Sequence, residues 1–198
     1  MGSMGDSVRI IDVIHNAFRG KRDRIIGVEV GVHRGVLSAT LLRTFPQLKL
    51  WMVDSWRAYD DSHPYRKSGD GCAKLTLEQQ ERNIEAAKKA VEFAMDRTVI
   101  VRGESELVAR RIMERISKGK SLFDFAFIDG DHTHEGVRAD IAAWWPLVNS
   151  GGLLAGHDID HPRDKRGIWG VRRAVEEHAA ECKIPFQVSG SCWWMFKG

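Results

Sequence analysis

The sequence has few cysteines, no long apolar run and no strong excess of either charge. Its three cysteines, Cys72, Cys182 and Cys192, show neither metal-binding nor redox spacing, and their odd number argues against a disulfide framework. No apolar run approaches the roughly 20 residues of a membrane-spanning helix, and the first residues lack the apolar core of a signal peptide. We therefore expect a reduced, soluble, cytoplasmic protein without a membrane partner.

The net charge of +3 in 198 residues is spread over a chain that mixes acidic and basic residues. This balance is too weak to indicate a nucleic-acid-binding surface. Because Met1-Gly2-Ser3 precede a second methionine, we expect residues 1–6 to be a tag remnant and a disordered start. Residues 7–198 are the right size for a single domain with a substantial core.

Short apolar runs alternate with amphipathic segments along the chain. The runs are mostly apolar on both faces, which is typical of parallel strands covered by helices on both sides. They cover residues 25–30, 48–56, 98–102, 122–129 and 152–159. A helix is expected around 7–18, and a hairpin is expected around Ser189-Gly190-Ser191. The prediction is an α/β, Rossmann-like open sheet that is mostly parallel, with a C-terminal antiparallel hairpin.

The first strand leads into an E-x-G-x-x-x-G turn formed by Glu29, Gly31 and Gly35. Glycines allow a ligand to approach the backbone closely, and a helix N-terminus offers free N–H groups. The G-x-G-x-x-G pattern of dinucleotide-binding folds is absent. An acidic residue before the first glycine suits a ligand that carries positive charge. On its own, however, such a turn is equally typical of tight packing.

Acidic residues also follow the second and third strands. The second strand ends in Asp54-Ser55 and the third in Gly103-Glu104-Ser105. A carboxylate at the tip of the second strand is where nucleoside-binding folds hold ribose hydroxyls, although each acid is also a common helix or turn cap. Since ligands of open α/β sheets bind outside the carboxyl ends of the strands, three acidic ends in a row indicate a binding site.

The fourth strand ends in FIDGDHTHEG and the fifth in GHDIDH. Neighbouring strands of the predicted sheet bring Asp129 close to His157 and Asp158, which together offer a general base or two to three metal ligands. For Asp131 we favour the role of N-cap of the next helix. His132 and His134 are interpreted as exposed residues of the first helical turn.

A polar stretch at residues 57–74 interrupts the pattern and is long enough to form a lid over a substrate. His63 and Tyr65 within it are candidates for contact with that substrate. Among the tryptophans, Trp56 and Trp169 are the best candidates for the pocket, because they follow the second strand and the segment after the fifth.

These motifs resemble those of a known family, the class I S-adenosylmethionine-dependent methyltransferases of the methyltransferase domain 24 type. The resemblance covers roughly residues 25–178. Its specific part is the stretch 123–159, which runs from FDFAFIDGDHTHEGV to the strand that ends in His-Asp. Shorter matches are VEVGVHRG at 28–35, MVDSW at 52–56, VRGES at 101–105 and WGVRRAVEE at 169–177.

The resemblance implies the cofactor S-adenosylmethionine and a role for each motif. Glu29 and Gly31 are expected at its methionine part, with Gly35 packing the helix. Asp54 and Ser55 are expected at the ribose, Gly103, Glu104 and Ser105 at the adenine, and Asp129 near the sulfonium. Asp129, His157 and Asp158 are the candidate ligands of a divalent metal, either Mg²⁺ or a transition metal, since imidazole suits the latter better.

The expected activity is methyl transfer to a small-molecule acceptor, chiefly to oxygen, with Asp129 or His157 as the base. A non-catalytic module that binds S-adenosylmethionine as a sensor or scaffold is the alternative from a different class. A nucleic-acid acceptor is disfavoured because the chain has no basic run. A homo-oligomer is left open, since the helix before the first strand is free to pack against a partner.

Overall fold

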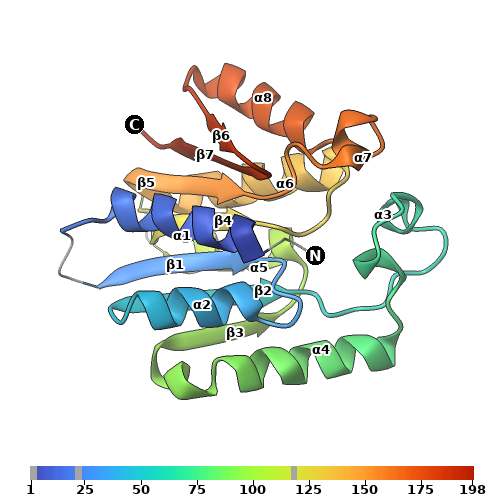
Figure 1. The fold of residues 1–198 in the computed structure, drawn as a ribbon, viewed down its shortest axis with the longest axis horizontal. Coiled ribbons are helices and arrows are strands. Elements are labelled where there is room, and N and C mark those ends of the chain that lie inside the picture. Colours follow the sequence, from blue (N-terminus) through green and yellow to red (C-terminus); the bar gives the residue numbers. More distant parts are fainter. Residues whose placement is uncertain (1–3, 21–23, 117–119) are drawn as a thin grey trace.

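A computed structural model describes residues 4–20, 24–116 and 120–198. Its centre is a seven-stranded sheet in the order β3-β2-β1-β4-β5-β7-β6 (Figure 1). The first five strands are parallel, and β7 runs antiparallel to both of its neighbours. The strands are β1 (Ile25–Val30), β2 (Leu48–Asp54), β3 (Thr98–Arg102), β4 (Phe123–Ile128), β5 (Val148–Gly156), β6 (Gln187–Ser189) and β7 (Cys192–Phe196).

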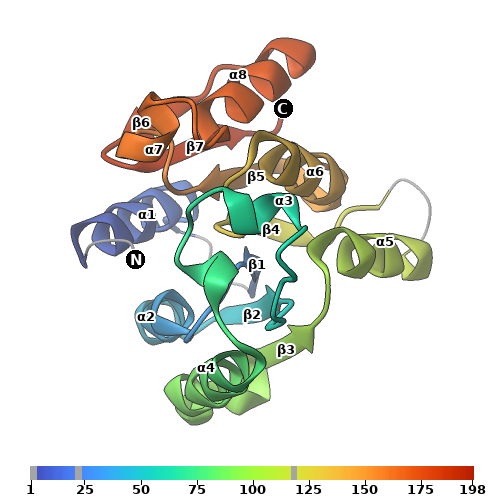
Figure 2. The ribbon, with the colours of Figure 1, turned by 90° about the vertical axis from the view of Figure 1, so that its right-hand side faces the viewer.

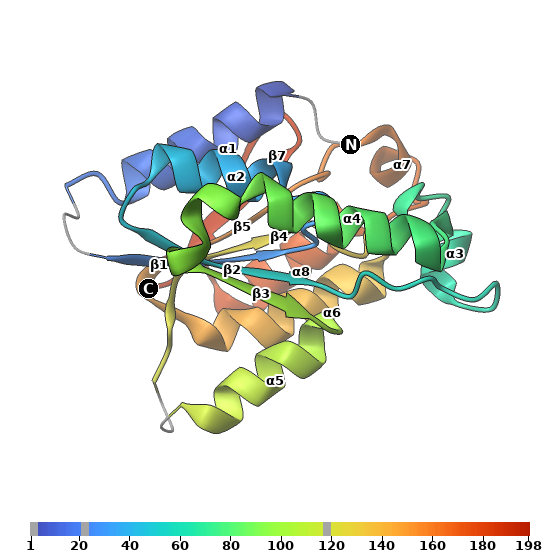
Figure 3. The same ribbon diagram turned by 90° about the horizontal axis from the view of Figure 1, so that it is seen from below.

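Helices cover both faces of the sheet (Figure 3). One face carries α1 (Met4–Ala17), α2 (Val36–Thr44) and α4 (Leu77–Ala90), and the other carries α5 (Ser105–Arg115), α6 (His134–Trp144) and α8 (Val171–Cys182). Each face has its own buried apolar cluster, which includes Leu41 and Phe125 on the first face and Ile141 and Trp193 on the second. The strands are apolar on both sides because they are buried on both sides.

This architecture confirms the predicted fold class, with small shifts at element ends. The β2 strand stops at Asp54, whereas β5 begins at Val148, four residues before the predicted start. The C-terminal hairpin is present as β6 and β7. The first helix begins at Met4, so it includes residues 4–6 of the stretch 1–6 that was predicted to be a tag remnant and a disordered start. Residues 1–3 of that stretch lie outside the described residues.

The stretch between β2 and α4 is folded, with a short helix α3 (Pro64–Lys67) and a 3₁₀ turn η1 (Cys72–Lys74). Figure 2 looks onto the carboxyl ends of the strands and shows α3 in front of β1 and β4. Another short helix, α7 (Pro162–Lys165), lies at the same edge after β5 (Figure 1). This edge of the sheet is therefore walled on two sides. No helix among the described residues is long and apolar enough to cross a membrane.

Candidate active site

A cavity of about 1050 Å³ lies at the carboxyl ends of the strands. It is lined by residues of every strand tip from β1 to β5 and by the stretch between β2 and α4. The predicted residues that line it are Glu29, Gly31, Asp54, Ser55, Gly103, Glu104, Ser105, Asp129, His157 and Asp158. Gly35 does not line it. A Cβ there would lie 3.0 Å from Ala87 Cα, so Gly35 packs the start of α2 against α4.

The end of β1 carries a buried carboxyl group, that of Glu29. Glu29 is 3% exposed and accepts a 2.5 Å hydrogen bond from the Ser38 hydroxyl. Burial raises the pKa of Glu29 to about 8. The hydrogen bond from Ser38 lowers this pKa, whereas the nearby charges of Asp129 and Asp54 raise it further. Gly31 follows at φ 88°, where a Cβ would fall 2.0 Å from the Asp129 carbonyl oxygen, so only glycine allows this approach of β1 to β4.

The carboxylate of Asp54 organises two turns at the β2 tip. Its Oδ2 accepts the His33 backbone N–H and its Oδ1 accepts the Trp56 backbone N–H, each at 2.8 Å. Both donors lie in left-handed backbone, at φ 53° and 39°. Trp56 is fully buried and donates its ring N–H to the His33 carbonyl, and it does not line the cavity. The prediction that Trp56 is a pocket residue is therefore wrong.

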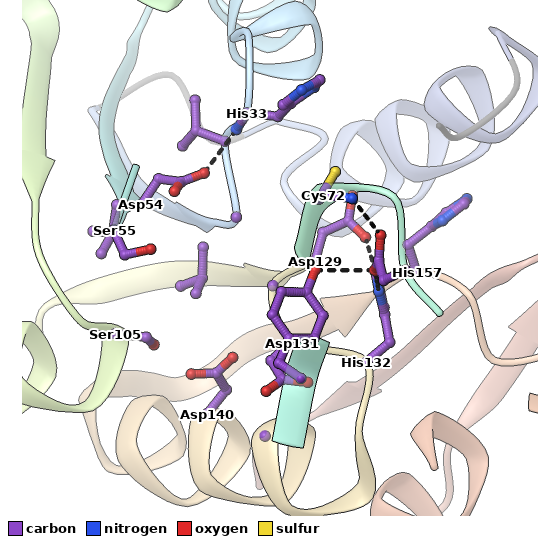
Figure 4. A pocket seen from close by; sticks show the side chains of 18 of the residues that line it. His33, Asp54, Ser55, Cys72, Ser105, Asp129, Asp131, His132, Asp140 and His157 are labelled. Atoms are coloured by element: carbon purple, nitrogen blue, oxygen red, sulfur yellow. Dashed lines mark hydrogen bonds and ion pairs between the residues drawn. The ribbon is translucent and has the colours of Figure 1, made fainter. Parts of the chain in front are cut away.

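The other end of the cavity holds a group of imidazole and carboxylate side chains around His132. Its Nδ1 lies 2.6 Å from Asp70 Oδ2, and its Nε2 lies 3.3 Å from Asp129 Oδ1 and 3.2 Å from Asp158 Oδ2. Figure 4 shows His132 on the same side of the cavity as Asp129 and His157. Burial opposes the charged form, yet hydrogen bonds to Asp129, Asp158 and Asp70 raise the pKa of His132 well above its usual value. The expectation of an exposed His132 is wrong, because its side chain is only 12% exposed.

Residues 28–159 match the methyltransferase domain family. This chain belongs to that family. The fold is that of a class I S-adenosylmethionine-dependent methyltransferase, as the resemblance predicted. No curated protein sequence matches the chain.

Solved structures with the same fold include methyltransferases of low sequence identity. The calicheamicin methyltransferase CalS11 has a TM-score of 0.70 at 16% identity, over 98% of this chain and 79% of its own. The O-methyltransferase NovP has a TM-score of 0.62 at 15% identity, over 96% and 78%. The methyltransferase MycE, solved in complex with Mg, SAH and mycinamycin VI, has a TM-score of 0.58 at 18% identity, over 94% and 49%. At these identities the likeness shows the shared fold.

The start of α6 differs from the prediction for this methyltransferase. Thr133 is the N-cap, and its hydroxyl accepts the Gly136 N–H at 3.1 Å. Asp131 lies before the cap, accepts the Thr133 N–H at 2.8 Å and lines the cavity, so the prediction that it is the cap is wrong. His134 is not exposed either, because it pairs with Glu177 of α8 at 2.7 Å.

Tyr65 and Trp169 border the end of the cavity that holds His132. Tyr65, predicted to lie here, is buried and donates its hydroxyl to Asp70 at 3.0 Å. Trp169 lines the cavity as predicted, and its ring stacks on His132 and on His161, with centroids 4.3 Å apart in both pairs. His157 Nδ1 lies 3.2 Å from Asp158 Oδ1, and Asp158 itself has a φ of 63°.

Two acidic residues of the site were not predicted from the sequence. Asp70 lies in the stretch between β2 and α4, where no periodicity indicates which side chain turns inward. Asp140 lies inside α6 and is 6% exposed, at a position that the sequence pattern does not distinguish from an ordinary polar helix residue.

Ligand atoms of Asp129, His132 and Asp158 lie within 4.8 Å of one another, so His132 rather than His157 completes the group that could hold a metal.

Proposed function

We propose that this methyltransferase moves the methyl group of S-adenosylmethionine to an oxygen of a small-molecule acceptor, with a divalent cation beside the acceptor. One observation carries the proposal: a single cavity has acidic strand tips at one end and the Asp129–His132–Asp158 group at the other. The first end suits a cationic nucleoside. The second suits a hydroxyl group that must lose a proton.

The order of the strand tips supports one orientation of the cofactor. The methionine part would lie at Glu29 and Gly31, the ribose at Asp54 and Ser55, and the adenine toward Gly103, Glu104 and Ser105. Both oxygens of Asp54 already accept backbone N–H groups, which leaves each a second lone pair for a ribose hydroxyl. In this orientation the sulfonium lies next to Asp129, at the entrance to the acceptor end.

The donor set at the acceptor end fits a divalent cation. Asp129 and Asp158 provide carboxylate oxygens and His132 provides Nε2, while its Nδ1 is held by Asp70 at 2.6 Å. A metal-binding histidine usually donates its second N–H to a carboxylate in this way. The imidazole favours a transition metal over Mg²⁺. A bound cation would lower the pKa of an acceptor hydroxyl.

The remaining work falls to the chain itself. Alignment of acceptor oxygen, methyl carbon and sulfur contributes on the order of 7–11 kcal/mol to lowering a barrier of this kind. Tyr65 and Trp169 line the cavity, and their rings would exclude water and orient the acceptor. His157 lines the cavity beside Asp158 and is our candidate, with Asp129, for taking the acceptor proton.

Calorimetric titration tests the cofactor half of the proposal. S-adenosylhomocysteine is expected to bind the wild type, and the variant Asp54→Ala is expected to lose most of that affinity. Absence of binding at millimolar ligand would overturn the proposal. The catalytic half is tested with a panel of hydroxylated acceptors and labelled S-adenosylmethionine, with Mn²⁺, Co²⁺ or Mg²⁺ added.

In the catalytic assay, transfer by the wild type and its loss in Asp129→Asn and His157→Ala support an enzyme. Cofactor binding that persists without transfer to any acceptor would instead support the sensor or scaffold function.

A further inference from the structure

Asp140 is a buried carboxylate at the cofactor end of the cavity that the functions assigned above do not use. It is 6% exposed, it lies in the middle of α6, and it lines the cavity with Ser105. Figure 4 shows Asp140 and Ser105 on the same side of the cavity as Asp54 and Ser55, across from Asp129, His132 and His157. Its Oδ2 lies close beneath Gly130, where a Cβ would be 3.2 Å away.

The surroundings of Asp140 provide a fixed hydrogen bond, and among the described residues the charges that act most strongly on it are negative. Ser105 Oγ accepts the Trp144 ring N–H at 2.8 Å, so the Ser105 hydroxyl hydrogen is available to Asp140, to which it is hydrogen-bonded. The charged groups that act most strongly on Asp140 are the acidic Asp131, Glu106 and Glu104. Burial and these charges raise the pKa of Asp140 to about 7, against the hydrogen bond from Ser105.

A buried carboxylate among other acids is costly unless a ligand brings a hydrogen-bond donor to it. The cofactor orientation proposed above turns the purine base toward Ser105 and α6. Adenine carries an exocyclic amino group with two N–H donors, whereas hypoxanthine carries a carbonyl oxygen at the same ring position. An amino group satisfies the Asp140 carboxylate, and a carbonyl oxygen repels it.

We propose that Asp140 accepts a hydrogen bond from the exocyclic amino group of the cofactor's base and makes this methyltransferase selective for adenine over hypoxanthine. The inference rests on the proposed cofactor orientation. Ser105 is then a positioning residue, because its hydroxyl holds one side of the carboxylate while Trp144 fixes the hydroxyl.

Calorimetric titration with S-adenosylhomocysteine and S-inosylhomocysteine tests the proposal. The titration is run at pH 8, because a pH above the raised pKa of Asp140, about 7, favours its charged form. The wild type is expected to bind the adenine ligand at least 10-fold more tightly. In Asp140→Ala this ratio is expected to fall to about 1–3, mainly through weaker binding of the adenine ligand. The amide of Asp140→Asn accepts from the amino group and donates to a carbonyl, so this variant is expected to bind both ligands.

The matched control is Asp124→Asn, which changes another buried carboxylate, in β4. Asp124 accepts the Ile26 N–H and does not line the cavity, so its loss is expected to lower stability and leave the ratio of affinities unchanged. A wild type that binds both ligands equally, or an Asp140→Ala variant with the wild-type ratio, would overturn the proposal. A wild type that binds neither ligand would overturn the proposed function instead.

Discussion

At the scale of single residues, Glu29 gives the methyltransferase a pH-dependent stability. Its pKa is raised from 4.5 to about 8 by burial, so the folded state favours the protonated acid. The contribution of Glu29 to the free energy of unfolding is therefore greatest below pH 4.5. It is lost progressively as the pH rises from 4.5 through about 8. Each unit of pKa shift corresponds to about 1.4 kcal/mol.

The variant Glu29→Gln cannot ionise but keeps an acceptor for the Ser38 hydroxyl. Between pH 5 and pH 8 the free energy of unfolding of the wild type is expected to fall by about 3–4 kcal/mol more than that of this variant. Urea denaturation across this range measures the difference. Parallel pH profiles for the two proteins would contradict the role of Glu29. The same variant is expected to bind S-adenosylmethionine more weakly.

Asp70 is expected to control metal affinity without touching the metal. It holds Nδ1 of His132 at 2.6 Å, and loss of such an outer partner usually lowers metal affinity about 10–100-fold. In Asp70→Asn, Co²⁺ or Mn²⁺ affinity measured by calorimetry is expected to fall by that factor, while S-adenosylhomocysteine affinity stays constant. The control is Asp61→Asn, an exposed carboxylate of the same stretch that pairs with Arg66. Unchanged metal affinity in Asp70→Asn would argue against this site.

The sequence predicts site residues where a strand fixes their direction. Glu29, Asp54 and Asp129 each end an apolar run, and parallel strands bring such ends to one edge of the sheet. His132 and Asp70 were missed because neither lies at, or directly after, the end of a strand. Their positions depend on a contact between residues 62 apart in the chain, which no local pattern records.

At the scale of elements, the N-cap of α6 is a direct test of how this helix begins. The Thr133 hydroxyl accepts the Gly136 N–H, and Thr133→Ala is expected to lower the free energy of unfolding by about 1 kcal/mol. Thr133→Ser keeps the hydroxyl and is expected to be close to the wild type. Urea denaturation measures both. A neutral Thr133→Ala would contradict this assignment of the cap.

Strands and long helices were predicted well, because burial on both faces and amphipathic spacing leave clear patterns. The stretch between β2 and α4 was not resolved into α3 and η1, since these elements are four and three residues long. Side-chain hydrogen bonds hold these elements in place. The Tyr65 hydroxyl donates to Asp70, and the Trp169 ring N–H donates to the Ser68 carbonyl. Such contacts depend on the finished fold.

At the scale of the whole molecule, the residues that stabilise the fold and the residues of the candidate site lie in different parts of the sheet. The apolar clusters lie on its two faces, whereas the cavity lies at its carboxyl edge. One tryptophan lies in each of these two regions and allows them to be compared. Trp193 of β7 is fully buried in the cluster beneath α5, α6 and α8, and Trp169 packs on imidazole rings at the cavity wall.

Truncation of Trp193 is expected to affect mainly stability, whereas truncation of Trp169 is expected to affect mainly metal binding and methylation. Trp193→Ala leaves a large void in the core and is expected to lower the free energy of unfolding by about 3–5 kcal/mol. Cofactor and metal affinities of the remaining folded protein are expected to stay constant, because Trp193 does not line the cavity. Trp169→Ala removes the ring that stacks on His132, so it is expected to cost less stability but to weaken Co²⁺ binding and acceptor methylation. Urea denaturation and calorimetry on both variants measure the contrast, and an equal loss of metal affinity in the two would show that the site depends on the core packing at Trp193.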